Sequence, residues 1–164
     1  MPDTPKFDPL GVLATLDRHR VAYIVIGAFA RVVQGAEEVT RGVDIVPSTR
    51  PQNLEKLEAA MSELGARGAG GQEPTAADLD REPLELETDR GELKIVPEPA
   101  GTRGYDDLRR AATREPLGRG LRPSVASLDD LARMLAARGR DEDREKLRAL
   151  RRLAELDLGR GLEL

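Results

Sequence analysis

The sequence contains no cysteine and no tryptophan, and aromatic residues make up only 2% of its 164 positions. Without cysteine the chain has no disulfide, no thiol nucleophile and no Cys-ligated zinc. With so few aromatic rings, its core must be built from Leu, Val, Ile and Ala side chains. The length suffices for one hydrophobic core. We therefore predict a single domain over residues 1–164, with a core part at 1–112 and C-terminal strands and helices at 113–164.

Long apolar runs and a basic, apolar leader are also missing, so we expect no membrane span, no signal peptide and a cytoplasmic location. The formal net charge is −4 and the pI is about 5.2. This balance provides no overall attraction to nucleic acid or anionic membrane, although a local basic patch remains open. The one histidine, His19, lies at a predicted helix-to-strand turn, where a surface or capping role is expected. Lysine is scarce and occurs at Lys6, Lys56, Lys94 and Lys146.

An apolar run followed by a glycine turn organises the chain. Residues 21–26 (VAYIVI) are continuously apolar, which is typical of a strand that is covered on both faces. Gly27 and Ala28 then form a tight turn into a short helix that ends near residue 33. A second extended stretch, residues 38–46, carries Asp44 in its apolar half. The pattern predicts strand, turn, helix and strand.

The remaining segments add helices around a β-hairpin. Strict alternation over residues 84–88, a turn at 89–91 and a return over 92–96 predict the hairpin, in the same sheet as residues 40–46. A Gly-rich stretch at 66–80 is interpreted as a loop, and two short strands are expected within 114–124. The predicted helices span residues 8–19, 51–65, 105–112 and 128–138, and the last begins at 141. This order predicts an α+β fold, a mixed sheet with packed helices and a C-terminal helical segment.

Several segments together resemble the polymerase-β-like nucleotidyltransferase superfamily. Residues 21–28 are similar to its opening strand and glycine turn, and residues 40–44 (TRGVD) are similar to its Thr-x-Asp-x-Asp motif. Residues 91–96 (GELKIV) match its hairpin strand, and residues 127–143 match its C-terminal Leu…Gly-Arg…Asp segment. The resemblance is closest to small bacterial members, the minimal nucleotidyltransferases and the abortive-infection toxin group. It implies a nucleotidyltransferase-like fold over most of the chain.

The resemblance also implies a site with three carboxylates, and this chain departs from it at two of them. In the family these carboxylates hold two Mg²⁺ ions that clamp the attacking oxygen and the triphosphate. The three positions fall on Gly42, Asp44 and Lys94, so only Asp44 has a carboxylate. We therefore expect no bound metal or cofactor and a degenerate site. Its candidate nucleotide or phosphate contacts are Gly27, Ala28 and Lys94.

Strand alternation refines this expectation. Lys94 shares a strand face with Glu92, and Asp44 shares one with Gly42, so Lys94 and Asp44 are predicted to meet as an ion pair. The alternative is a solvated edge lysine. The same alternation places Arg41 on the face opposite Gly42. Acidic side chains in the Gly-rich loop, at Asp78 and Asp80, are expected to be solvated.

Three functions remain open from the sequence. The first is a non-enzymatic binding or regulatory protein that has lost two-metal catalysis. The second is an active, toxin-like nucleotidyltransferase that uses Mg²⁺ and an unrecognised carboxylate, Glu92 or Glu38, to transfer NMP to RNA or protein. The third is an interaction module that binds a protein partner or a second copy through Leu147, Leu150 and Leu153 on the C-terminal helices. The turn at Gly27 is equally compatible with anion binding and with no ligand.

Overall fold

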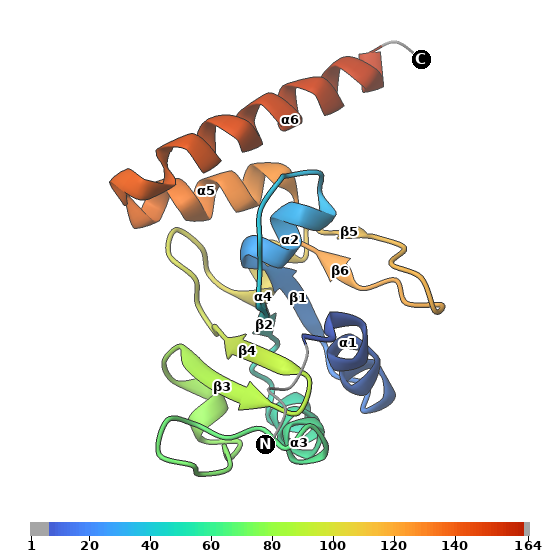
Figure 1. Cartoon of the computed structure of the whole chain (residues 1–164), viewed down its shortest axis with the longest axis vertical. Helices are drawn as coiled ribbons and strands as arrows, with labels where there is room; N and C mark the ends of the chain where they lie inside the picture. Colours follow the sequence, from blue (N-terminus) through green and yellow to red (C-terminus); the bar gives the residue numbers. More distant parts are fainter. Residues whose placement is uncertain (1–6, 163–164) are drawn as a thin grey trace, which may run out of the picture.

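The computed structural model describes residues 7–162, and a six-stranded mixed sheet forms its centre (Figure 1). The strand order is β3-β4-β2-β1-β6-β5. Parallel pairing joins β2 to β4 and β1 to β6, whereas the other neighbours are antiparallel. The strands span Tyr23–Ile26 (β1), Gly42–Pro47 (β2), Leu84–Thr88 (β3), Gly91–Ile95 (β4), Thr113–Arg114 (β5) and Ser124–Val125 (β6).

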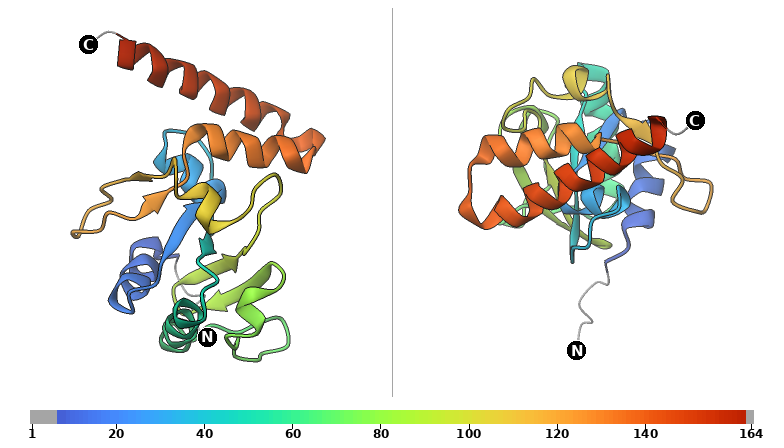
Figure 2. Two further views of the ribbon diagram at one scale, coloured as in Figure 1. Left: turned by 180° about the vertical axis from the view of Figure 1, so that it is seen from behind. Right: turned by 90° about the horizontal axis from the view of Figure 1, so that it is seen from above.

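Helices surround the sheet in two groups. Near one end α1 packs against α3, and at the other end the α5–α6 pair is stacked beyond α2 (Figures 1 and 2). The helices span Pro9–Arg18 (α1), Gly27–Val33 (α2), Pro51–Glu63 (α3), Tyr105–Leu108 (α4), Leu128–Arg138 (α5) and Arg144–Leu162 (α6). Short 3₁₀ turns occupy Asp78–Asp80 (η1) and Asp141–Asp143 (η2). Among residues 7–162, no helix combines the length and apolarity that a membrane span requires.

The predicted hairpin is confirmed and is joined to β2. β4 pairs in parallel with β2, which places Gly42 opposite Glu92 and Asp44 opposite Lys94. Alternate side chains of these strands are buried, because one face of the sheet packs into the core. The buried set on β2, β4 and β3 comprises Val43, Ile45, Leu93, Ile95 and Leu86. The opposite face is left for polar groups.

The second strand begins later than the sequence pattern predicts. Residues 38–41 are not part of β2, which starts at Gly42. The side chain of Glu38 turns instead to Arg31 of α2, which donates two hydrogen bonds to it. The prediction failed because a side-chain contact outside the strand, absent from the local pattern, holds this segment.

Helix ends follow the capping chemistry of the sequence. The Ser127 hydroxyl accepts a hydrogen bond from the Asp130 N–H at 3.1 Å, and Gly139 ends α5 with φ of 62°. One buried polar residue, Asn53 of α3, was not singled out from the sequence. Its side-chain oxygen accepts a hydrogen bond from the N–H of Ala22, and its side-chain NH₂ donates to the carbonyls of Ala22 and Ser48. Because Ala22 precedes β1 and Ser48 follows β2, α3 anchors the start of β1 and the end of β2.

Candidate functional site

Asp44 lies where β2 passes the start of α2. It is opposite Ile26 of β1 on one side and opposite Lys94 of β4 on the other. Gly27 begins α2 with φ of 75°, and a Cβ atom there would lie 2.5 Å from Oδ2 of Asp44. Glycine is therefore required twice at this turn, once for the backbone angle and once for the approach of the carboxylate.

Burial changes the acidity of Asp44. Desolvation raises the pKa of its carboxyl above the usual 3.8, and the nearby charges of Lys94, Arg31 and Arg138 oppose that rise. Two of these cations, Arg31 and Arg138, come from helices that the sequence did not connect with the site. Asp44 is thus a partly desolvated acid with three cationic side chains nearby.

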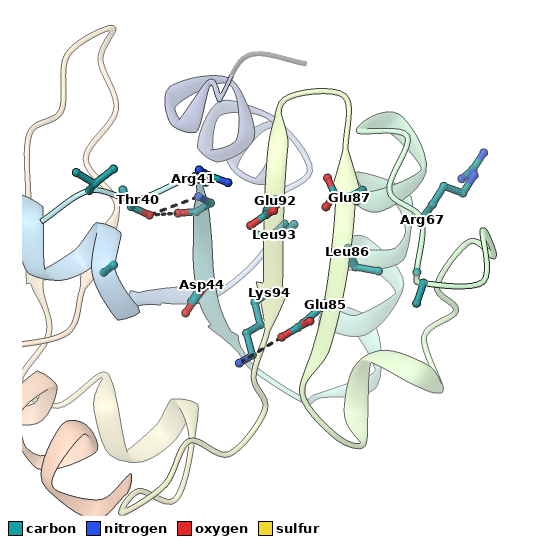
Figure 3. Close-up of a pocket in the computed structure, with 15 residues that line it drawn as sticks. Thr40, Arg41, Asp44, Arg67, Glu85, Leu86, Glu87, Glu92, Leu93 and Lys94 are labelled. Carbon is teal, nitrogen blue, oxygen red and sulfur yellow. Dashed lines mark hydrogen bonds and ion pairs between the residues drawn. The ribbon is translucent and has the colours of Figure 1, made fainter. Parts of the chain in front are cut away.

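Lys94 is in the predicted register but has a different partner. Its Nζ lies 3.9 Å from Oε1 of Glu85 on β3, as Figure 3 shows. No ion pair within 4.0 Å joins Lys94 to Asp44 in the described part of the chain, so the predicted direct pair is wrong. Glu85 is the cross-strand neighbour of Lys94 on the other side and is 84% exposed at its side chain. The ammonium reaches this solvated partner without losing its own water, which explains the preference.

A cleft of about 470 Å³ opens over the polar face of β2, β4 and β3. Asp44, Lys94 and Glu92 face into it, together with Ala28 from the start of α2. Arg41 also lines the cleft, contrary to the prediction that it would lie on the opposite face. Because Arg41 precedes the first residue of β2, strand alternation does not apply to it.

A smaller cavity of about 190 Å³ lies on the other side of Asp44, against α5. Its charged lining comprises the acids Asp44 and Glu98 and the cations Lys94, Arg31, Arg138 and Arg140. Leu131 and Met134 form part of its apolar wall. Of these residues, Arg140 had a sequence signal, because it belongs to the Gly139–Arg140 pair of the segment that resembles the family's C-terminal motif. Asp44 therefore borders two cavities, and guanidinium groups line the smaller one.

The position occupied by Gly42 is closed as well as empty. A Cβ atom at Gly42 would lie 2.6 Å from the backbone oxygen of Glu92 and 2.9 Å from its Cβ. An aspartate at this position would therefore force the two strands apart. The pairing of β2 with β4 therefore leaves no room for a side chain at residue 42.

The residues present do not fit a pair of Mg²⁺ ions. Among residues 7–162, no group of three or more His, Cys, Asp or Glu side chains is arranged to hold a metal ion. Mg²⁺ requires a near-octahedral set of oxygen ligands, whereas an ammonium carries a positive charge and no free electron pair. Lys94 therefore repels a dication from the space beside Asp44.

Other acids and the histidine have structural partners. Glu38 is only 12% exposed and accepts hydrogen bonds from Nε and Nη2 of Arg31 at 2.6 and 3.0 Å, with Lys146 Nζ 3.9 Å away. Nε2 of His19 lies 3.2 Å from Glu63, at the surface. The Asp78 carboxylate accepts hydrogen bonds from the N–H and hydroxyl of Thr75. None of these groups points into the cleft over Asp44.

The arrangement of strands and helices is that of a nucleotidyltransferase-like α+β fold. Among solved structures, the chain is similar to a candidate nucleotidyltransferase from Thermotoga maritima, with a TM-score of 0.57 and 19% sequence identity. The similarity covers 85% of this chain and 88% of that chain. No family model matches the sequence, and no curated protein is significantly similar to it. At this identity the comparison establishes the fold, and it confirms the predicted fold class.

Proposed function

We propose that this chain is a nucleotidyltransferase-fold protein that has lost two-metal catalysis and acts as a binding or regulatory protein. The observation that carries the proposal is the register of β2 with β4. It places Lys94 opposite Asp44, with the ammonium directed to Glu85, and it closes the Gly42 position with the backbone of Glu92. Two of the three positions at which the family resemblance implies metal ligands therefore have no carboxylate.

The ligand that fits this site best is a nucleotide held without a divalent metal. Lys94, Arg31, Arg138 and Arg140 all line the smaller cavity beside Asp44. Arg31 and Arg138 are already bonded to Glu38 and Asp143, so Lys94 and Arg140 supply the positive charge that phosphate oxygens require. The raised pKa of Asp44 lowers the repulsion between its carboxyl group and a phosphate. The start of α2 at Gly27 adds backbone N–H groups on the same side.

Calorimetric titration with ATP, GTP and CTP, with and without Mg²⁺, tests the proposal. We expect one of them to bind with an affinity that Mg²⁺ does not increase. Replacing Lys94 by methionine removes a charge-assisted contact worth about 1.5–3 kcal/mol, and binding should weaken roughly 10- to 100-fold. Lys56→Met is the matched control, because Lys56 is exposed on α3 and lines neither cavity. Failure of all three nucleotides to bind, or a binding that requires Mg²⁺, would contradict the proposal.

One observation favours the second candidate function, an active nucleotidyltransferase of the toxin-like kind. Glu92 faces the cleft opposite Gly42 and lies on the same face as Asp44. In that case Asp44 and Glu92 would together coordinate Mg²⁺, and the enzyme would transfer NMP to RNA or protein. Mass spectrometry after incubation with nucleotide and Mg²⁺ distinguishes the two. An added nucleotidyl mass on the protein or on RNA, lost in Glu92→Gln, would favour the enzyme.

A further inference from the structure

The two most exposed large apolar side chains come together in one groove. Among residues 7–162, the large hydrophobic residues that are exposed are Val39, at 94%, and Leu156, at 61%. Both line a groove of about 870 Å³ between residues 35–39 and α6. Single exposed apolar residues are common, but two that line the same groove indicate a surface for another chain.

The helix α6 has two apolar stripes, and the rest of the chain buries one of them. Leu150 is buried and Leu147 packs beside it, which places α6 on α5. Ala149, Leu153 and Leu156, spaced four and three apart, line the groove instead. α6 has 19 residues and α5 has 11. At 1.5 Å per residue α6 therefore extends roughly 12 Å further than α5, and it runs past the start of α5 in Figure 1.

Charge along α6 is separated into two blocks. Residues 144–152 carry five basic side chains and one acidic one, whereas residues 153–157 carry two acidic side chains and no basic one. In the described part of the chain, Arg148 and Arg152 beside the groove have no ion-pair partner within 4.0 Å, and the same holds for Glu155 and Asp157. An antiparallel copy of α6 would bring the acidic block onto the basic block twice, whereas a parallel copy would oppose like charges.

We propose that the chain forms a homodimer in which two α6 helices pair antiparallel about a two-fold axis over this groove. A two-fold interface is self-complementary, so Arg148 and Arg152, which line the groove, meet Glu155 of the other copy, which flanks the same side of α6 three residues after Arg152. The apolar stripe of each helix covers Val39 and Leu156 of its partner. This inference rests on α6 and residues 35–39, and it is independent of the proposed nucleotide binding.

The dimer would border the cleft over Asp44. Val39 lines both the groove and that cleft, and Thr40 and Arg41 follow directly in the cleft wall. A partner copy that packs on Val39 therefore fixes one wall of the cleft.

Two charge-reversal variants of the full chain test the pairing by sedimentation equilibrium. The wild-type chain should show a mass of twice 17.9 kDa. Arg148→Glu with Arg152→Glu should raise the dimer dissociation constant at least about 100-fold, and separately Glu155→Arg at least about 10-fold, because each self-pairing then opposes like charges. An equimolar mixture of the two variants should form a heterodimer, since both contacts are complementary again.

The control reverses the same number of charges outside the groove. Arg114→Glu with Arg122→Glu changes two exposed residues that lie outside α6 and do not line the groove, and this variant should remain dimeric. A wild-type chain that stays monomeric at all concentrations would overturn the proposal. So would folded, monomeric variants that fail to associate when mixed, because antiparallel pairing requires that rescue.

Discussion

Gly27 is the residue on which the turn into α2 depends most. Its φ of 75° is unfavourable for any side chain, and its missing Cβ leaves room for Oδ2 of Asp44. We expect Gly27→Ala to lower the free energy of unfolding by about 1–3 kcal/mol in urea titrations. Gly71→Ala is the matched control, because Gly71 has φ of 80° but no atom within 4 Å of a Cβ there. Equal losses in the two variants would show that contact with Asp44 contributes nothing.

Asp44 should make stability depend on pH in a defined direction. Its pKa is raised in the folded chain, so the folded state keeps a proton that the unfolded state releases above the usual 3.8. The free energy of unfolding therefore falls as pH rises from that value through the raised folded pKa. The asparagine in the variant Asp44→Asn does not titrate, so the variant does not lose stability in this way. Relative to wild type, its free energy of unfolding should therefore rise toward neutral pH, and the two chains should differ less near pH 3.8. Urea unfolding of both chains between pH 4 and 8 measures it, and a difference that does not vary with pH would contradict the raised pKa.

The residues of the site were predictable to different degrees. Period-two alternation together with the family resemblance placed Lys94 beside Asp44. The ion-pair partner was missed although the hairpin was predicted, because Glu85 and Asp44 are both cross-strand neighbours of Lys94 and the local pattern does not show which one the ammonium reaches. Arg31 and Arg138 were missed because only tertiary packing brings their helices to Asp44.

At the scale of elements, one buried ion pair connects α2 with the segment before β2. The side chains of Arg31 and Glu38 are 7% and 12% exposed and form two hydrogen bonds. Glu38→Gln leaves the Arg31 charge without a counterion and should cost about 3–5 kcal/mol of unfolding free energy. The exposed pair Arg18–Glu63 provides the control, and Glu63→Gln should cost less than about 1 kcal/mol. Similar costs in the two variants would mean that burial of the first pair is unimportant.

Elements with local chemical signals were predicted well. The α5 boundaries follow from Ser127 and Gly139, and the hairpin follows from alternation around residues 89–91. Segments held by distant contacts were predicted less well. The helix expected over 105–112 ends at Leu108, and the strand expected from 38 begins at Gly42. The spacing of apolar residues does not show at which residue the backbone hydrogen bonds of a helix or strand begin or end.

For the whole molecule, we propose that the chain unfolds as a single domain. One cluster of buried apolar residues runs from Val12 in α1 to Leu150 in α6, with contributions from every strand of the β1, β2 and β4 centre. We expect one cooperative transition, in which the calorimetric and van't Hoff enthalpies agree. Two separate transitions in differential scanning calorimetry would show instead that residues 113–164 fold apart from the core.

The central claim is that the site beside Asp44 no longer takes a divalent metal. Crystals soaked in Mn²⁺ together with a nucleotide test it directly, because Mn²⁺ accepts the same oxygen ligands as Mg²⁺ and is visible by anomalous scattering. The account predicts no anomalous peak within coordination distance of Asp44, since Lys94 and the closed Gly42 position leave it a lone ligand. A peak bridging Asp44 and Glu92 would contradict the account and would favour an active enzyme.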